Sequence, residues 1–307
     1  MRMLVVGAGS VGGYFGGMLA KAGRDVTFLV RPNRARQLEA GLTIVDRDGE
    51  HVIPVRTISA GMGAGAFDVV FLSVKAFQLA GAMGDFAPYV GDDTIILPIL
   101  NGMKHMDVLR ERFGATHVIG GVARVAASLD EAGKVLDQGI FHDLIYGEWN
   151  GGKSSRIMAL DAFLTHAAFD ARLSSEIERE MWEKWAQLAG LGAITCLMHA
   201  DTRQIALAEG GRAFMEAMFH EVMRAISDAW RPLPDRFQSQ TLDWLTNTQS
   251  ALTSSMYRDM QIPGRRLESD EIIGDLLKRA GGTIGTFPLL SAVFTRLKIH
   301  ENRQESA

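Results

Sequence analysis

Cysteine is nearly absent from this chain of 307 residues, which contains only Cys196. A single cysteine excludes a disulfide within the chain and suits a reducing compartment, so we expect a cytoplasmic protein. No run of about 20 apolar residues without charge occurs, so we expect no membrane span. Basic and acidic residues nearly balance, at 32 and 36, which gives no reason to expect a nucleic-acid partner. The histidines lack metal-ligand spacing, so we expect no metal site.

The stretch that follows the first apolar run is rich in glycine. Gly7, Gly9 and Gly12 come after Met3–Val6 with G-x-G-x-x-G spacing. In dinucleotide-binding turns these glycines permit the tight turn, the approach of the pyrophosphate and the close packing of the helix. The start of the helix adds free N–H groups and a positive dipole end. A glycine-rich turn without a ligand is the alternative. The residues predicted to bind the cofactor here are Gly7, Gly9, Ser10, Val11 and Gly12.

Arg31 ends the second apolar run, at a position where NAD sites usually have Asp or Glu. A carboxylate accepts a hydrogen bond from the ribose 2′-OH but repels a 2′-phosphate. A guanidinium can bind that phosphate with two hydrogen bonds. We therefore predict NADP(H) rather than NAD(H) as the cofactor. In the alternative interpretation, Arg31 and Arg34 are solvated loop charges.

Apolar runs alternate with helical patterns in the first half of the chain. This alternation predicts a doubly wound, mostly parallel sheet in a Rossmann-type α/β domain. The segment Val135–Glu148 contains turn residues, which predicts an antiparallel hairpin at the edge of the sheet. The predicted strands are Met3–Val6, Asp25–Val30, Phe67–Val74, Thr94–Leu100 and His117–Ala123.

After about residue 172 the pattern becomes helical. A long helix over the stretch around Lys184 is followed by the predicted helices Phe214–Trp230, Arg236–Tyr257, Glu271–Arg279 and Leu289–Arg296. We predict residues 1–172 to be the NADP-binding domain and residues 173–307 to be an all-α domain for substrate binding and dimerisation. Ligands of open α/β sheets bind beyond the carboxyl ends of the strands. A helical domain there would close a cleft over the nicotinamide, and its apolar residues offer a homodimer interface.

Polar residues at strand ends are the first candidates for chemistry. Lys75 follows "FLSV" and Asn101 follows "ILPIL", so each lies where cofactor and substrate should meet. Such side chains can bind the nicotinamide ribose or a substrate carbonyl. They can equally be solvated residues at strand ends, and the two interpretations weigh the same from these residues alone.

Further candidates lie in the helical half. Lys184 is flanked by Trp182 and Trp185, and a lysine on an apolar face is unusual. Desolvation would lower its pKa and make it a competent proton donor. Ser255 could bind a carboxylate, and Glu268 could hold a substrate hydroxyl or pair with Lys184. In the alternatives, Lys184 is a surface lysine and the other two are ordinary polar residues at a helix end and in a loop.

The combination of these motifs resembles the ketopantoate reductase (2-dehydropantoate 2-reductase) family over nearly the whole chain. The motifs occur in the order "SVKAFQ", "LNGM", "IYGEW", "WEKWAQL", "SSMYRDMQIPGRRLESDEIIG" and "TFPLL". The pairing of "SSM.RD" with "E.DEIIG" is far more specific to the family than the glycine motif is.

The resemblance implies NADPH-dependent reduction of ketopantoate, a 2-oxo acid, to a 2-hydroxy acid for pantothenate biosynthesis. It implies that Lys184 is the general acid and that Glu268 orients Lys184 and the substrate hydroxyl. Lys75 and Asn101 would lie near the nicotinamide ribose and the substrate, with Glu268 also close to the cofactor. Ser255 would hold the substrate carboxylate.

The chain departs from the family after the lysine. The family helix usually has asparagines one and two turns later, where this sequence has Leu188 and Gly192. The "NP.T" run is replaced by "GAIT", and the loop before Glu268 is one residue longer. These changes leave two further hypotheses open. One is a reductase of another 2-oxo or 3-oxo acid, and the other is a non-catalytic NADP-binding sensor or subunit.

Overall fold

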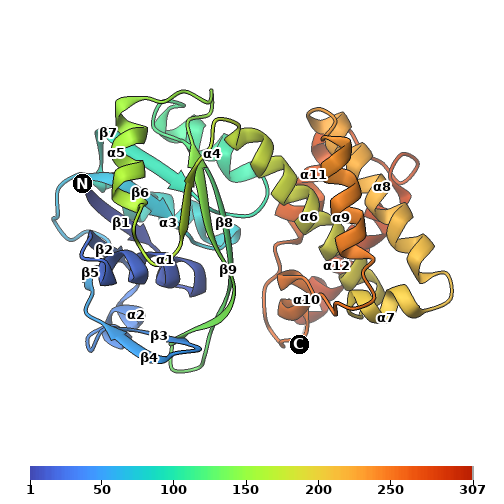
Figure 1. Ribbon diagram of the computed structural model, residues 1–307, viewed down its shortest axis with the longest axis horizontal. Coiled ribbons are helices and arrows are strands. Elements are labelled where there is room, and N and C mark those ends of the chain that lie inside the picture. The colour runs from blue at the N-terminus through green and yellow to red at the C-terminus, as the bar shows by residue number, and fades with distance from the viewer. Residues whose placement is uncertain (306–307) are drawn as a thin grey trace. The chain divides into compact units, whose positions relative to one another are not determined.

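The computed structural model describes residues 1–305, which form two compact units. Unit 1 comprises residues 1–100 and 105–180, and unit 2 comprises residues 101–104 and the chain from 181 onward. Figure 1 shows the strands gathered in the N-terminal part of the chain and helices in the C-terminal part. The predicted fold class is confirmed: a parallel sheet with helices is followed by an all-helical part.

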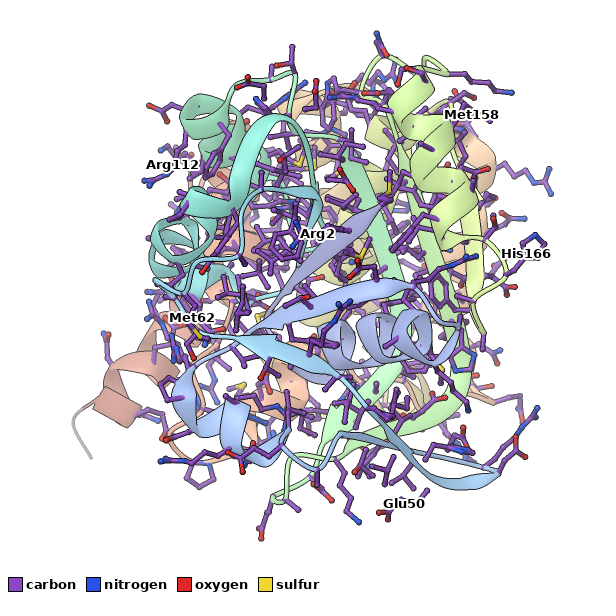
Figure 2. All side chains as sticks on the ribbon, turned by 90° about the vertical axis from the view of Figure 1, so that its left-hand side faces the viewer. Arg2, Glu50, Met62, Arg112, Met158 and His166 are labelled. Atoms are coloured by element: carbon purple, nitrogen blue, oxygen red, sulfur yellow. The ribbon has the colours of Figure 1, made fainter. Side chains whose placement is uncertain are left out.

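The first sheet of unit 1 contains five parallel strands in the order β5-β2-β1-β6-β7. The chain runs outward from β1 in both directions, as in a doubly wound sheet, so the carboxyl end of β1 adjoins those of β2 and β6. Arg2 fixes the other end of β1, because its guanidinium lies 4.5 Å from the Phe67 ring and donates to Ala64 and Ala66 (Figure 2). The strands are β1 Arg2–Val6, β2 Asp25–Leu29, β5 Arg56–Ile58, β6 Phe67–Leu72 and β7 Val90–Pro98.

A second sheet in unit 1 was not predicted. Its strands are ordered β10-β9-β3-β4, and β8 pairs with β9 in antiparallel orientation. The predicted hairpin within Val135–Glu148 is wrong, because β9 is a single strand over Val135–Gly147 and its hairpin partner is β8, Gly120–Leu129. Only an isolated bridge from Ile96 to Val118 joins the predicted strand His117–Ala123 to the first sheet. The other strands are β3 Leu42–Asp46, β4 Gly49–Ile53 and β10 Asp170–Leu173.

Helix α1 (Ser10–Lys21) is packed against both sheets, and its glycines explain how (Figure 1). A Cβ at Gly16 would lie 2.7 Å from the Phe28 ring of the first sheet. A Cβ at Gly17 would lie 2.7 Å from Leu42 of the second sheet. Both distances are shorter than van der Waals contact, so the glycines allow sheets to approach the helix from two sides. The remaining helices of unit 1 are α2 Pro32–Gln37, α3 Leu79–Phe86 and α5 Ser155–Leu164, and α4 spans Lys104–Phe113.

Unit 2 is helical throughout its described residues apart from loops. The long α6 spans Ile177–Met198. The predicted helix Arg236–Tyr257 is wrong, because α9 ends at Leu245 and α10 starts at Ser255. The polar stretch between them breaks the helix, since Ser and Thr side chains compete for backbone groups. The other elements are α7 Thr202–Leu207, α8 Gly211–Ala229, a π-helical segment Asp270–Gly274, α11 Asp275–Arg279 and α12 Pro288–Glu305. No helix in residues 1–305 has the length and apolarity that a membrane span needs.

Candidate functional site

The glycine turn joins the end of β1 to the start of α1, as its spacing predicts. Gly7 has a φ of +94°, a left-handed conformation that glycine adopts without strain. A Cβ at Gly12 would overlap the Ser73 hydroxyl and the Gly7 carbonyl oxygen, which is why the helix can lie so close to the strand. A Cβ at Gly9 would have no neighbour within 4 Å. Open space at Gly9, beside the N-terminus of a long helix, fits the approach of a pyrophosphate.

Ser73 supports this turn from the carboxyl end of β6, and the sequence analysis missed it. Its hydroxyl lies 2.9 Å from the Gly7 carbonyl oxygen and 3.1 Å from that of Val6. A hydroxyl has one proton, so it can donate to one of these oxygens at a time. The turn is thereby attached to the neighbouring strand. A serine directly after a buried strand was the available signal.

The two arginines after β2 differ in their surroundings. Arg31 is exposed and precedes Pro32, the first residue of α2. An exposed guanidinium at this strand end is available to a phosphate. Arg34 is half-buried, and its Nε donates to the Ala8 carbonyl oxygen at 3.0 Å. The interpretation of Arg34 as a solvated loop charge is therefore wrong.

Lys75 lies on the same edge of the first sheet as the glycine turn. It is exposed and precedes the short 3₁₀ helix Ala76–Gln78, whose Gln78 N–H donates to the Lys75 carbonyl at 2.8 Å. Its neighbour Val74 approaches the turn so closely that a Cβ at Gly7 would lie 3.1 Å from Val74 Cγ1. The glycine turn and Lys75 thus lie on one edge of unit 1, whereas Asn101 and Glu268, also predicted near the cofactor, belong to unit 2.

Unit 2 brings together two motif residues that are far apart in the chain. Asn101 Nδ2 donates to Glu268 Oε2 at 3.3 Å across 167 sequence positions. Glu268 is only 5% exposed, so its carboxylate depends on partners for its hydrogen bonds. Gly102 has a φ of +75°, and a Cβ there would lie 2.6 Å from the Glu271 carbonyl oxygen. The turn after Asn101 is therefore packed directly against the π-helical segment that follows Glu268.

Lys184 lies on α6 between two buried tryptophans and is itself half-buried. Trp185 donates from Nε1 to the Ile272 carbonyl at 2.9 Å, which attaches α6 to the segment that follows Glu268. Trp182 stacks on Trp230 with ring centroids 5.3 Å apart. The helix turn that carries Lys184 and the segment that carries Glu268 are thus held together within unit 2.

Ser255 is the first residue of α10 and is half-buried. The helix cap is its neighbour Ser254, whose hydroxyl accepts from the Tyr257 N–H at 2.9 Å. Ser254 Oγ is also 3.0 Å from Thr195 Oγ1, and this hydrogen bond joins α10 to α6. Ser254 and Thr195 are supporting residues that the sequence analysis missed, although a serine before a helix is a recognisable cap.

Gly192, one of the two departures from the family motif, lies next to an apolar side chain. A Cβ at Gly192 would lie 3.0 Å from Met256 Cε, so a larger residue at this position would displace the methionine. Leu188, between Lys184 and Gly192 on the same face of the helix, is half-buried. The two helical turns after the lysine therefore offer no polar side chain at these positions.

A second carboxyl group modifies the electrostatics near Glu268. Burial raises the pKa of Glu271, and the negative charge of Glu268 acts in the same direction. Lys104, in the same stretch as Asn101, lowers that pKa. Among residues 1–305, no group of three or more His, Cys, Asp or Glu side chains is arranged to hold a metal ion.

Known proteins resemble this chain in both its N-terminal and its C-terminal part. Residues 3–151 match the family model "Ketopantoate reductase PanE/ApbA", and residues 176–301 match "Ketopantoate reductase PanE/ApbA C terminal". The "Uncharacterized oxidoreductase YkpB" of Bacillus subtilis is 33% identical over 98% of this chain and 99% of its own length. The 2-dehydropantoate 2-reductase of Nostoc is 24% identical, over 99% of this chain and 97% of its own.

The solved structure of a 2-dehydropantoate 2-reductase from Geobacter metallireducens has a TM-score of 0.86 and is 26% identical. It covers 97% of this chain, and 99% of the Geobacter chain is matched. The fold and the matched sequence define an oxidoreductase, and the protein is therefore an enzyme of that class. Within that class, the chain belongs to the ketopantoate reductase family and shares its 2-oxo acid reductase chemistry.

Proposed function

We propose that this enzyme reduces the ketone of a 2-oxo acid with NADPH and that ketopantoate is the substrate expected from its family. The observation that carries the proposal is the hydrogen bond from Asn101 to the buried Glu268, within the unit that contains Lys184. These residues are the ones that the family motifs mark, and nothing in their sequence spacing requires them to meet. Reduction of ketopantoate gives pantoate, and the enzyme would then serve pantothenate biosynthesis.

The proposed cofactor site is the glycine turn with Arg31 and Lys75. Open space at Gly9 and the start of α1 suit a pyrophosphate, and the exposed Arg31 suits a 2′-phosphate. NADPH bound there supplies the hydride. The choice of NADPH over NADH rests on Arg31 and on the absence of an acidic residue at the end of β2.

In the proposed mechanism, Lys184 is the general acid. Hydride arrival at the carbonyl carbon places negative charge on the oxygen, and the Lys184 ammonium donates a proton to that oxygen. Glu268 holds the substrate hydroxyl and orients Lys184, and Asn101 orients Glu268 through its amide. Ser255, on the first turn of α10, hydrogen-bonds the substrate carboxylate. Of these groups, Lys184 stabilises charge that develops only during the reaction, whereas Ser255, Glu268 and Asn101 hold the substrate and Lys184 in position.

A 2-oxo acid with a more apolar side chain is a second candidate substrate. Leu188 and Gly192 replace the family's asparagines, and Met256 fills the space that a side chain at position 192 would take. Each hydrogen bond missing from a polar substrate is worth on the order of 1 kcal/mol, or about fivefold in binding. The 33% identity to an oxidoreductase without an assigned substrate is compatible with such a change.

Progress curves with NADPH and a panel of 2-oxo acids test the proposal. The panel contains ketopantoate, its analogue without the hydroxyl, and longer aliphatic and aromatic 2-oxo acids. We expect NADPH oxidation with at least one member. Turnover of ketopantoate more than tenfold below that of another acid would reject pantothenate synthesis and favour the apolar substrate. Tight NADPH binding without oxidation by any member would reject every 2-oxo acid of the panel as the substrate, ketopantoate included.

A further inference from the structure

Arg34 connects the glycine turn to a second turn in unit 1. Its Nε donates to the Ala8 carbonyl oxygen at 3.0 Å, between the first two glycines of the motif. Its Nη1 donates to the Gly133 carbonyl oxygen at 2.8 Å, in the turn between β8 and β9. One guanidinium thus joins two backbone segments that are more than a hundred residues apart in the chain.

The turn that receives Arg34 is itself held firmly. Gly133 has a φ of +84°, which favours glycine, and a Cβ there would displace Arg34 Nη1. Its N–H donates to the Asp130 carbonyl oxygen at 3.1 Å. The next residue, Lys134, reaches Glu50 on β4 with an Nζ–Oε2 distance of 2.6 Å, and Figure 2 labels Glu50 on that strand. Arg34 therefore links the glycine turn to a turn that has hydrogen bonds of its own.

The bond to Ala8 determines the direction of an N–H group in the glycine turn. The peptide between Ala8 and Gly9 is planar and trans, because the structure contains no cis peptide among its described residues. In a trans peptide the N–H points opposite to the carbonyl. When Arg34 holds the Ala8 oxygen, the Gly9 N–H points away from Arg34. Rotation of this peptide would turn the oxygen toward the side that the N–H now faces, where an anion would be repelled.

The surroundings of Arg34 distinguish it from Arg31. Arg34 Nη2 is buried and makes no hydrogen bond in the described structure, whereas Arg31 is exposed. Arg34 Nε and Nη1 are engaged with backbone carbonyls, and Nη1 also donates to Gln37 Oε1 at 3.0 Å. We propose that Arg34 is a positioning residue: through its hydrogen bond to Ala8 it orients the glycine turn for the pyrophosphate, which NADPH and NADH share. This rests on the nucleotide site proposed above, in which Arg31 alone distinguishes the two cofactors.

Dissociation constants for NADPH and NADH, measured by fluorescence on the full-length protein, test the proposal. Arg34→Met removes a hydrogen bond from a charged donor, so we expect it to raise the dissociation constants of NADPH and NADH by about tenfold each. The ratio of the two constants should stay unchanged. Arg34→Lys should fall between Arg34→Met and the wild type, since an ammonium cannot donate in the two directions of the guanidinium fork. Arg36→Met is the matched control, because Arg36 lies on the same short helix, is exposed and donates from its side chain to Asn33, one helical turn away.

A second pair of variants tests the same contact from the other side. Gly133→Ala should displace the Arg34 guanidinium and weaken the binding of NADPH and of NADH by the same factor. Gly139→Ala is its control, because Gly139 also has a positive φ, +68°, but a Cβ there meets nothing within 4 Å. The unfolding temperature of each cofactor-free variant is measured first, and binding is compared well below it. If Arg34→Met does not fold, Arg34→Lys and Gly133→Ala decide the question.

Two results would overturn the proposal while leaving the proposed function intact. Unchanged affinity for both cofactors in the folded Arg34 and Gly133 variants would show that the contact does not position the turn. A loss of affinity for NADPH alone would show that Arg34 contacts the 2′-phosphate directly. Failure of the wild-type protein to bind either cofactor is a different outcome, which rejects the nucleotide site and this proposal with it.

Discussion

The glycine turn of unit 1, the proposed nucleotide site, is built mainly from backbone, whereas the candidate site of unit 2 is built from side chains. Gly7, Gly9 and Gly12 act by lacking a Cβ, and they lie within six consecutive residues. Asn101 and Glu268 act through an amide and a carboxylate, and they meet across 167 positions. A site made of backbone is encoded locally and tolerates little change, while a site made of side chains can change its specificity one residue at a time.

The largest expected effect is in the side-chain site of unit 2. Lys184→Ala should lower kcat by about 100-fold or more, because it removes the proposed proton donor, and should leave the NADPH dissociation constant within about twofold. Steady-state kinetics and fluorescence titration measure the two quantities. Lys278→Ala is the control, since Lys278 is an exposed lysine of α11 in the same unit. Near-normal turnover of Lys184→Ala would remove this lysine from the mechanism.

A smaller effect is expected at the one side chain that we assign to cofactor choice in unit 1. Arg31→Asp should weaken NADPH binding by about tenfold to 100-fold and narrow its advantage over NADH, because a carboxylate repels the 2′-phosphate. Binding of both cofactors is measured in parallel, with the neighbouring Arg36→Asp as the control for charge. The account of Arg31 would be contradicted by an unchanged NADPH/NADH preference.

A third prediction concerns a polar side chain introduced at position 192, near the candidate site of unit 2. Gly192→Asn combined with Met256→Ala restores an amide and gives it room, since Met256 Cε now occupies the space next to Gly192. We expect kcat/KM for ketopantoate to rise by about fivefold relative to its analogue without the hydroxyl, the value of one hydrogen bond. The single variant Met256→Ala separates the effect of space from that of the amide. Equal changes for both acids would show that this position does not contact the substrate.

The smallest effect on activity is expected from a charge pair that belongs to neither site. Arg156 donates to both carboxylate oxygens of Glu148, each at 2.7 Å, and this pairing lowers the pKa of Glu148 despite the opposing effect of burial. A carboxyl group with a lowered folded-state pKa stabilises the protein above its ordinary pKa of 4.5 and loses that contribution as pH falls through the folded value.

Arg156→Met should therefore reduce stability by about 1.5–3 kcal/mol at neutral pH, and by less in acid, with turnover of the folded enzyme unchanged. Urea unfolding at a series of pH values measures this difference. Arg112→Met is the control, because Arg112 is exposed at the outer edge of unit 1 in Figure 2. A loss of stability that is the same at every pH would contradict the assigned role of the Glu148 charge.

The contrast between backbone and side chains also explains what could be predicted from sequence. The glycine turn and strands β1, β2, β6 and β7 were predictable because apolar runs and glycine spacing are local signals. The second sheet was missed because β3 and β4 are short and partly exposed, so their apolar alternation is weak. Strand β9 was misread because its central residues are exposed and include Gly139, which resembles a turn.

Side-chain contacts between distant segments had no local signal. No periodicity links Asn101 to Glu268 or Trp185 to Ile272. Asn101 was a candidate from its place after a strand and Glu268 as a carboxylate able to pair with Lys184, but nothing local predicted that the two would meet. Thr195 and Ser254 support α10 by a hydrogen bond that depends on how two helices pack. Arg34 was visible as a charge, but its commitment to Ala8 depends on where the chain folds after β2. Such contacts follow from tertiary structure rather than from spacing.

A double-mutant cycle of Arg31→Asp and Lys184→Ala tests most directly whether Arg31 acts in cofactor binding and Lys184 in the chemical step. NADPH affinity and kcat are measured for the wild type, both single variants and the double variant. We predict that Arg31→Asp changes the NADPH dissociation constant, that Lys184→Ala changes kcat, and that the double variant shows both losses, additive in free energy within about 0.5 kcal/mol. A Lys184→Ala enzyme that turns over normally, or one whose entire loss lies in NADPH binding, would contradict the account.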